Sequence, residues 1–216
     1  QNADNKTITL KANTTLDSGT KITDGTKFTV DGGGKYVIRL LGDVTLTGYG
    51  AEARFTNVTV DLNKNHFALE RQAAMKLMKG AILENGYAKE GSHGGGAAQV
   101  MNGCTFTMEE GSYVRNCSSS GTGGAFRVNA AKFTMTGGTI ENCLAGTSGG
   151  ALSIVYDAEF TMSGGTIKGN KGTKGGGVYI GDHSGDKAIG YFSGSATVTG
   201  NSAGGSANNV QPFFPS

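Results

Sequence analysis

The sequence predicts an all-β protein, a parallel β-solenoid in which each coil of about 27 residues contributes three short strands. The main observation is a repeat, whose copies align on glycine pairs that begin at Gly95, Gly123, Gly149 and Gly175. Each copy holds three stretches of alternating apolar and polar residues, and alternation with a period of two is typical of strands. Strands this short, repeated three times in every period, favour stacked coils over a sandwich of longer hairpins.

Stacked coils would place equivalent residues about 4.8 Å apart and so build columns of side chains inside the solenoid. The triplet Phe-Thr-Met begins at Phe106, Phe133 and Phe160, which predicts a phenylalanine column that Phe192 continues, with a methionine column beside it. A second interior wall is predicted from the apolar residues after the glycine pairs, which are Val100, Val128, Ile154 and Ile180. A single coil cannot bury these groups, whereas a stack of coils can.

The third stretch of each copy predicts a column of charges on the outside of the solenoid. Its charged residues are, in order, Glu84, Arg115, Glu141 and Lys168, so their signs alternate from coil to coil. Opposite charges on paired strands attract each other by roughly 0.2–1 kcal/mol, and like charges repel. The alternation therefore supports stacking in this register.

The chain divides into a less regular and a regular part. Residues 1–62 keep strand-like stretches but lack the glycine-pair repeat, and we interpret them as an N-terminal cap with irregular first coils. Residues 63–216 are interpreted as regular β-helix coils with a C-terminal tail, so that the whole chain is one continuous domain. Residues 66–79 could form a short helix or a strand, and the ungapped match of 75–85 to 106–116 favours a strand.

Composition excludes several classes of protein. The 19 basic and 17 acidic residues give a net charge of +2, which offers no electrostatic reason to expect nucleic acid or anionic lipid as a partner. No apolar run approaches the ~20 residues needed to cross a bilayer, so we expect no membrane-embedded segment. Three cysteines without a CxxC pair disfavour zinc, and we expect neither a metal nor a cofactor. Cys117 and Cys143 fall on equivalent positions, so buried free thiols and a disulfide are both open.

The repeat also resembles a known type of protein. Coils of the form Gly-Gly-Ala-[Leu/Val]-x-[Ile/Val], followed by Phe-Thr-Met-[Thr/Ser]-Gly-Gly-Thr-Ile-x-x-Asn, resemble the right-handed parallel β-helix regions of large bacterial surface proteins, which have the pectin-lyase-like fold. The similarity is strongest over residues 95–201 and weaker over 20–94. It implies a right-handed parallel β-helix that is secreted or displayed at a bacterial cell surface, where many such regions are adhesins or adhesin-like.

The strand after each glycine pair carries one outward-pointing polar residue, and these residues are Gln99, Arg127, Ser153 and Tyr179. An amide, a guanidinium, a hydroxyl and an aromatic ring can together stack on a sugar chain and form hydrogen bonds with it. A solenoid also offers a long, flat face to an extended ligand. The sequence therefore predicts a monomeric scaffold that binds a glycan or a host or cell-surface protein without catalysis. The alternative is that these are ordinary solvent-facing strand residues.

A second candidate site is the loop in which Asp182, His183 and Asp186 crowd together. We include these three among the candidate binding residues, although a solvated turn also explains them. Because the pectin-lyase-like fold hosts polysaccharide lyases and glycoside hydrolases, which use converging carboxylates, such an enzyme is the alternative function. We assign no catalytic residue. A structural spacer is a further alternative.

Overall fold

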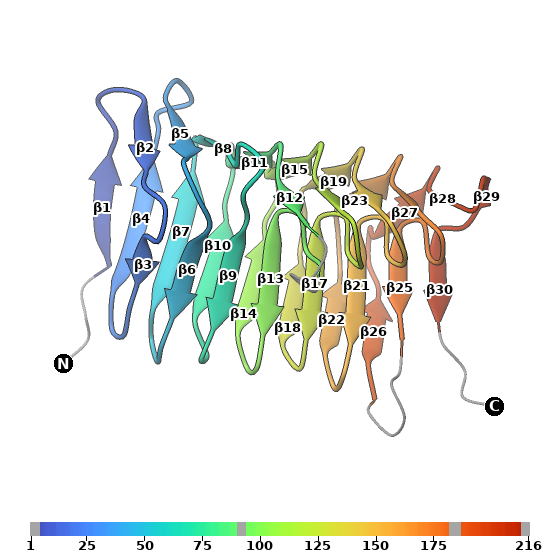
Figure 1. The fold of residues 1–216 in the computed structure, drawn as a ribbon. Coiled ribbons are helices and arrows are strands. Elements are labelled where there is room, and N and C mark those ends of the chain that lie inside the picture. The colour runs from blue at the N-terminus through green and yellow to red at the C-terminus, as the bar shows by residue number, and fades with distance from the viewer. Residues whose placement is uncertain (1–4, 90–93, 182–186, 213–216) are drawn as a thin grey trace.

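The computed structural model describes residues 5–89, 94–181 and 187–212. Within these ranges the chain contains strands and no helix, and it winds into a right-handed parallel β-helix whose coils stack along one axis (Figure 1). Three long sheets of eight strands each form its walls, and a fourth sheet has six short strands. The predicted fold class is confirmed.

We name the four sheets A to D. Sheet A consists of β1 (Lys6–Thr9), β4 (Lys27–Asp31), β7 (Glu52–Thr56), β10 (Ala74–Leu77), β14 (Thr105–Met108), β18 (Lys132–Met135), β22 (Glu159–Met162) and β26 (Ile189–Phe192). Sheet B consists of β2 (Thr14–Leu16), β5 (Val37–Leu40), β8 (Thr59–Asp61), β11 (Ile82–Glu84), β15 (Tyr113–Arg115), β19 (Thr139–Glu141), β23 (Thr166–Lys168) and β27 (Thr197–Thr199). Sheet C consists of β3 (Lys21–Ile22), β6 (Val44–Thr47), β9 (Phe67–Glu70), β13 (Ala98–Met101), β17 (Phe126–Asn129), β21 (Leu152–Val155), β25 (Val178–Ile180) and β30 (Val210–Pro212). Sheet D consists of β12 (Tyr87–Ala88), β16 (Ser118–Ser119), β20 (Leu144–Ala145), β24 (Lys171–Gly172), β28 (Ser202–Ala203) and β29 (Ser206–Ala207).

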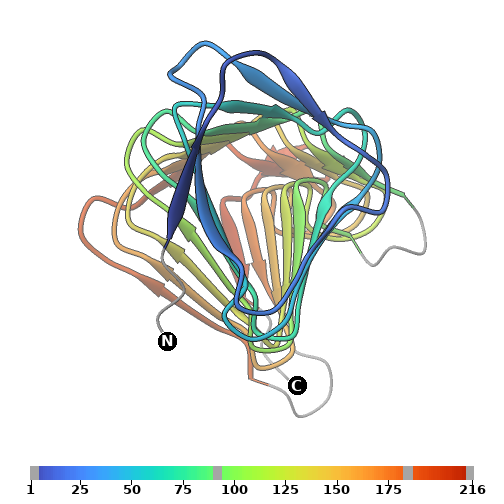
Figure 2. The same ribbon diagram turned by 90° about the vertical axis from the view of Figure 1, so that its left-hand side faces the viewer.

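Each coil contributes one strand to sheets A, B and C in turn, and the later coils add a fourth short strand in sheet D, which the sequence did not predict. The length of the connection between sheets B and C explains this difference. Residues 41–43 and 62–66 make that connection in early coils, whereas 85–97 and 116–125 make it in later coils. The longer segment has room for an extra rung, and in Figure 2 the later coils turn sharply where the first coils keep an open triangular outline.

The last five strands of sheet B, β11 to β27, are each followed by a residue in the left-handed conformation. Asparagine and glycine are the residues that adopt a positive φ most readily, because other side chains clash with the backbone there. The residues at this corner all have φ between 54° and 66°, and they are Asn85, Asn116, Asn142, Gly169 and Gly200. The residue after the last two is a buried asparagine, and Asn170 and Asn201 donate side-chain hydrogen bonds to Ile140 O (3.1 Å) and Ile167 O (2.9 Å).

The interior columns form as predicted in the middle coils. The rings of Phe106 and Phe133 stack with 5.2 Å between centroids, and Phe160 packs edge-on against Phe133 at 5.8 Å. The methionine column and the second wall are also in register. The prediction for Phe192 is wrong by two positions, because Gly190 lies opposite Phe160 and Phe192 lies opposite Met162. The Phe192 ring still packs against Phe160, with 5.5 Å between the ring centroids, in the space that Gly190 leaves.

The first coils belong to the same walls as the regular ones. Strands β1 to β8, from residues 6–61, pair in parallel with one another and then with β9, β10 and β11. Residues 66–79 form strands, and the ungapped match is confirmed by the pairs Met75–Phe106 and Leu83–Val114. Cys117 and Cys143 are buried free thiols in neighbouring coils. Burial, followed by the hydrogen bond between the two thiols, raises the pKa of Cys143.

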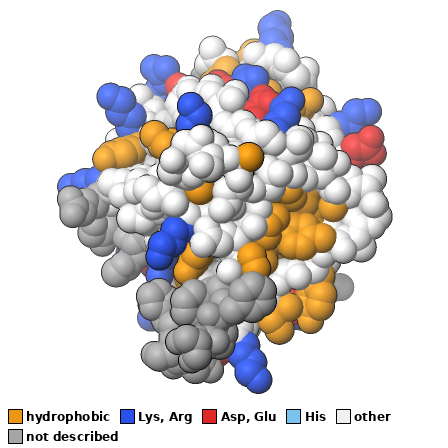
Figure 3. Space-filling view, turned by 90° about the vertical axis from the view of Figure 1, so that its right-hand side faces the viewer, with side chains coloured by type: hydrophobic (Ala, Val, Ile, Leu, Met, Phe, Trp, Pro, Cys, Tyr) orange, Lys and Arg blue, Asp and Glu red, His pale blue; other side chains and the backbone are white. Residues whose placement is uncertain are grey.

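Apolar side chains of the first and last coils are only partly covered. At the N-terminal end a cavity of about 290 Å³ is lined by Ile8, Leu10, Leu16, Phe28 and other apolar residues. Figure 3 views the opposite end, where apolar side chains gather over the last coil. The half-buried residues that pack on the core there include Ile180, Ala196, Val198 and Val210. The fully covered core therefore lies in the middle coils, which also carry the candidate site.

Candidate functional site

The predicted ladder of polar residues is in register on the outer face of sheet C. Gln99 of β13 lies opposite Arg127 of β17, Arg127 lies opposite Ser153 of β21, and Ser153 lies opposite Tyr179 of β25. The flanking residues on β13, β17 and β21 point inward, and those beside Arg127, Phe126 and Val128, are fully buried; on β25 Ile180 is partly buried. Strand alternation thus places four different polar side chains in one outward column.

The column is more enclosed than its outward direction suggests. Gln99 and Arg127 are only 7% and 9% exposed, Ser153 is fully buried, and Tyr179 is half-buried. The first three side chains are therefore largely enclosed and do not face solvent, and whether the column binds a ligand stays a prediction. Neighbouring long side chains lie along the face: the Arg127 guanidinium reaches over the Tyr156 ring of the next coil, 5.8 Å from its centroid. The Tyr179 ring lies against Gly181, where a side chain would overlap it.

Arg127 has an unusual electrostatic position. Among the described residues no carboxylate lies within ion-pair distance of its guanidinium, and its contact there is the aromatic face of Tyr156. Burial lowers the pKa of Arg127, while the nearby Tyr156 acts in the opposite direction. A guanidinium keeps its charge in proteins, so this face holds a largely buried positive charge that no described carboxylate pairs with.

The hydroxyl of Ser153 lies on the next rung. Its Oγ is buried and has no hydrogen-bond partner in the part of the chain that the structure describes. Buried polar groups without a partner are rare in folded proteins and call for an explanation. Sheet C therefore carries one buried hydroxyl that the described protein does not satisfy, on the rung next to Arg127.

The candidate loop residues Asp182, His183 and Asp186 lie outside the described residues. The chain on either side of that loop is described. Gly181 N donates to Ile154 O at 3.0 Å, and Lys187 N donates to the Asp157 carboxylate at 2.9 Å. The loop therefore connects β25 of sheet C to β26, the last strand of sheet A, and a role for its three residues stays a prediction.

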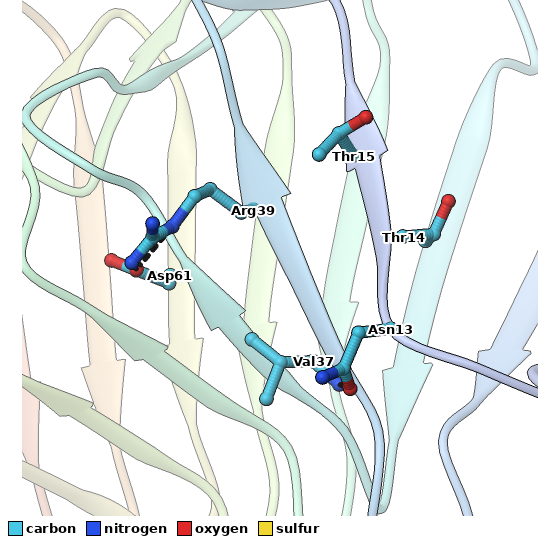
Figure 4. Close-up of a pocket in the computed structure, with 6 residues that line it drawn as sticks. All are labelled: Asn13, Thr14, Thr15, Val37, Arg39 and Asp61. Carbon is cyan, nitrogen blue, oxygen red and sulfur yellow. Dashed lines mark hydrogen bonds and ion pairs between the residues drawn. The ribbon is translucent and has the colours of Figure 1, made fainter.

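Sequence reasoning missed a large hollow on the outer face of sheet B. Its volume is about 610 Å³, and Figure 4 shows the six residues that line it: Asn13, Thr14, Thr15, Val37, Arg39 and Asp61. Arg39 donates two hydrogen bonds to Asp61 Oδ2, from Nε at 2.9 Å and from Nη2 at 2.7 Å. Burial would raise the pKa of Asp61, but hydrogen bonds from Arg39, Asn85 and the Asn63 backbone outweigh it and lower the pKa. The two charged residues of this hollow, Arg39 and Asp61, are therefore already paired with each other.

A second hollow that the sequence did not indicate has a volume of about 460 Å³ and opens beside the first strands of sheet D. Its lining consists of Lys64, Asn85, Gly86, Tyr87, Asn116 and Ser118. The signal that could have found it is the pair of left-handed asparagines, Asn85 and Asn116, which end successive sheet B strands. The ring of Tyr87 is exposed beside them. Amide groups around an exposed ring can contact a sugar, but here no buried polar group of the lining lacks a partner.

Several carboxylates on the described surface pair with a lysine or an arginine. The predicted charge column is confirmed, with Glu84 bound to Arg115 at 2.8 Å and Glu141 to Lys168 at 3.3 Å. Further pairs on sheet A join Lys76 to Glu109 and Lys132 to Glu159. Within the described ranges, no three His, Cys, Asp or Glu side chains gather as metal ligands would.

In the same ranges, the structure has no helix with the length and apolar character required to span a membrane. Comparison of the chain with protein-family models, with curated proteins and with solved structures gives no match.

Proposed function

We propose that this protein is a bacterial binding scaffold of the pectin-lyase-like type, secreted or displayed at the cell surface, which acts as an adhesin for glycan or host protein. The observation that carries the proposal is the in-register column of Gln99, Arg127, Ser153 and Tyr179 on sheet C. The protein acts as a monomer and without catalysis. Glycan is the ligand class that these side chains fit best.

The rigidity of the scaffold supports this function. The strands that hold the column are backed by a fully buried interior, so the positions of the binding groups are fixed before a ligand arrives. A preorganised site loses less conformational entropy on binding than a loop would. Residues on strands β13 to β25 therefore suit repeated, extended recognition of a polymer.

The chemistry of the column supports a sugar ligand. Aromatic rings offer an apolar body with a polar tip, and the guanidinium of Arg127 adds five donors in a planar arrangement. The pairing of three glutamates on the outer faces of sheets A and B supports binding over catalysis at those positions, because a general acid or nucleophile must be available to the substrate. Glu84, Glu141 and Glu159 each contact a cation in a neighbouring coil instead.

A glycan array, run alongside a cleavage assay on the same glycans, tests the proposal. We expect saturable binding without cleavage, lost in Arg127→Ala and Tyr179→Ala. The matched controls are Arg115→Ala and Tyr113→Ala, which remove the same side chains from the outer face of sheet B. Cleavage that disappears in Asp182→Asn or Asp186→Asn would overturn the proposal in favour of a lyase or hydrolase. Equal binding by all four alanine variants would show that the column on sheet C is not the binding surface.

A further inference from the structure

We infer that Cys117 and Cys143 are a redox-active pair that closes into a disulfide bond between neighbouring coils under oxidising conditions, a modification that goes beyond the proposed binding function. The chain contains three cysteines, and Cys104 is the third. All three are buried free thiols in the structure, so the choice of partners depends on where the coils place them.

Cys117 and Cys143 each lie directly before a strand of sheet D. Ser118 of β16 pairs with Leu144 of β20, and Leu144 N donates to Cys117 O at 3.0 Å. The two cysteines therefore occupy equivalent places in adjacent coils. Neighbouring strands are about 4.8 Å apart, and disulfides join Cα atoms that are roughly 4.4–6.8 Å apart. The backbone thus holds the two Cα atoms within the range that a disulfide requires.

The two thiols also have matching orientations. Cys117 Sγ donates to the carbonyl oxygen of Arg115 at 3.3 Å. Cys143 Sγ donates to the carbonyl oxygen of Glu141 at the same distance, and the two thiols form a hydrogen bond with each other. A thiol is a weak donor, so turning either side chain toward the other sulfur loses little.

The column that holds the two cysteines already joins later coils through side chains. Its next members are the buried residues Asn170 and Asn201, which the register of sheet D places after Cys143. Asn170 Oδ1 accepts from Cys143 N at 2.9 Å. Asn170 Nδ2 donates to Asn201 Oδ1 at 2.9 Å. A disulfide to Cys117 would extend this series of side-chain links by one more coil.

Cys104 has alanines where the other two cysteines have each other. It lies directly before β14, whose register with β10 and β18 places Ala73 and Ala131 in the equivalent positions. The backbone confirms this placement, because Lys132 N donates to Cys104 O at 3.0 Å. Cys104 is therefore a built-in control, a buried thiol whose counterparts in the adjacent coils are not cysteines.

A small-molecule disulfide such as oxidised glutathione is the oxidant. The thiolate of one cysteine attacks a sulfur of the oxidant, forms a mixed disulfide and releases one glutathione thiol. The thiolate of the other cysteine then attacks the protein sulfur of this mixed disulfide and releases the second glutathione thiol. In total the two cysteines lose two electrons and two protons, and the oxidant gains them.

Burial determines when this exchange occurs. Cys117 and Cys143 are each only 1% exposed, and burial raises the pKa of the Cys143 thiol. The thiolate is the attacking species, so the closed coils disfavour the exchange. Oxidation therefore proceeds while the chain folds in an oxidising compartment, or when the corner before sheet D opens.

Peptide mapping of the unaltered chain tests the inference. The reduced protein is refolded with reduced or with oxidised glutathione, its free thiols are blocked with iodoacetamide in denaturant, and a trypsin digest is analysed by mass spectrometry without reduction. Trypsin releases the three cysteines in separate peptides, 90–115, 116–127 and 133–168. After oxidation we expect 116–127 and 133–168 to be joined, with the loss of two hydrogens, and 90–115 to carry the blocking group. Blocked thiols in all three peptides, or a link that includes 90–115, overturns the inference.

Urea unfolding under oxidising and reducing conditions gives a second measurement. The bond closes the loop from 117 to 143, so we expect oxidation to lower the unfolding equilibrium constant by about a hundredfold, and added reductant to reverse this change. Cys117→Ser should remove the difference between the two conditions, whereas the matched control Cys104→Ser should keep it. A difference that persists in Cys117→Ser, or that disappears in Cys104→Ser, overturns the pairing. Equal stability of the unaltered chain in both conditions overturns it without any variant.

Discussion

The outer faces of sheets B and C are built from the same kind of strand, yet they treat charge in opposite ways. From β5 to β23 every strand of sheet B presents one charged residue in a single outward column. These residues close into three ion pairs, which are Arg39–Asp61, Glu84–Arg115 and Glu141–Lys168. Where the alternation fails, between Asp61 and Glu84, Asn85 donates to the Asp61 carboxylate at 3.2 Å.

Sheet C has no such compensation in its described strands. Arg127 is as enclosed as Asp61 on sheet B, yet its described contact is an aromatic ring instead of an oppositely charged group. Ser153, on the adjacent rung, has an unused hydroxyl. The charged groups of the sheet B column thus pair with one another, whereas the sheet C column holds an arginine without a described carboxylate partner and one unsatisfied hydroxyl.

A substitution in the interior that sheets B and C share should change the free energy of unfolding the most. Phe126 lies directly before Arg127, and its ring is 4.7 Å and 4.8 Å from those of Phe106 and Phe133. Phe126→Ala should lower the free energy of unfolding by about 3–5 kcal/mol, since it leaves a cavity in a closely packed column. Urea unfolding measures this. The control Tyr113→Ala, at a half-exposed ring on sheet B, should change it by less than about 0.5 kcal/mol; equal losses would contradict a shared interior.

Alanine substitutions at two buried serines, one near each sheet, should change the free energy of unfolding in opposite directions. Ser153→Ala removes an unsatisfied hydroxyl from sheet C and should raise the free energy of unfolding by about 1 kcal/mol. Ser112, equally buried at the start of β15, donates to Glu109 O at 2.6 Å. Ser112→Ala should therefore lower the free energy of unfolding by about 1 kcal/mol. Thermal and urea unfolding report both values, and a loss of stability in Ser153→Ala would show that its hydroxyl is satisfied after all.

A double-mutant cycle on each face tests the difference between sheets B and C, and its expected coupling energies are smaller than the effects above. Glu84→Gln and Arg115→Gln, alone and together, should give a coupling energy of about 0.2–1 kcal/mol, because the pair is partly exposed. Added salt should weaken this coupling. The matching cycle on sheet C, with Glu70→Gln and Arg127→Gln, should be additive. A coupling of similar size there would mean that Arg127 has an ionic partner.

The sequence predicted most of the fold because the repeat carries it. Phe106, Phe133 and Phe160 occupy equivalent places in three copies, and stacking follows directly from their spacing. Phe192 was misplaced because β26 departs from the repeat and puts a glycine where the phenylalanine stands in other coils. Sheet D was missed because its two-residue strands are too short to show a period.

The candidate site was predictable in position but not in environment. Alternation fixes which side of a strand Arg127 and Ser153 face, and so their register was correct. How deeply they are buried depends on where long side chains lie in the next coil, which no strand pattern encodes. The ion pair of Arg39 and Asp61 was overlooked for another reason: the first coils lack the glycine pairs that align the later ones. Their positions directly after inward-facing apolar residues were the available signal.

The smallest predicted effect concerns His66, at the corner where the chain passes from sheet B to sheet C. Its backbone N–H donates to the Asp43 carboxylate at 2.9 Å, and its Nδ1 lies 3.1 Å from the same oxygen. Burial lowers the pKa of His66 below the usual 6.5, although the Asp43 charge acts to raise it. Below pH 6.5 the unfolded chain therefore takes up a proton at His66 more readily than the folded protein does.

The contribution of His66 to the free energy of unfolding is complete above pH 6.5. It declines as the pH falls from there toward the pKa of His66 in the folded protein. We expect His66→Gln to flatten the stability profile between about pH 7 and pH 5, as measured by urea unfolding at each pH. Asp43→Asn removes the opposing charge and should steepen the same profile, since burial then acts alone. If both variants follow the unaltered protein, the corner between the two faces does not titrate, and any acid sensitivity in this range must come from elsewhere in the chain.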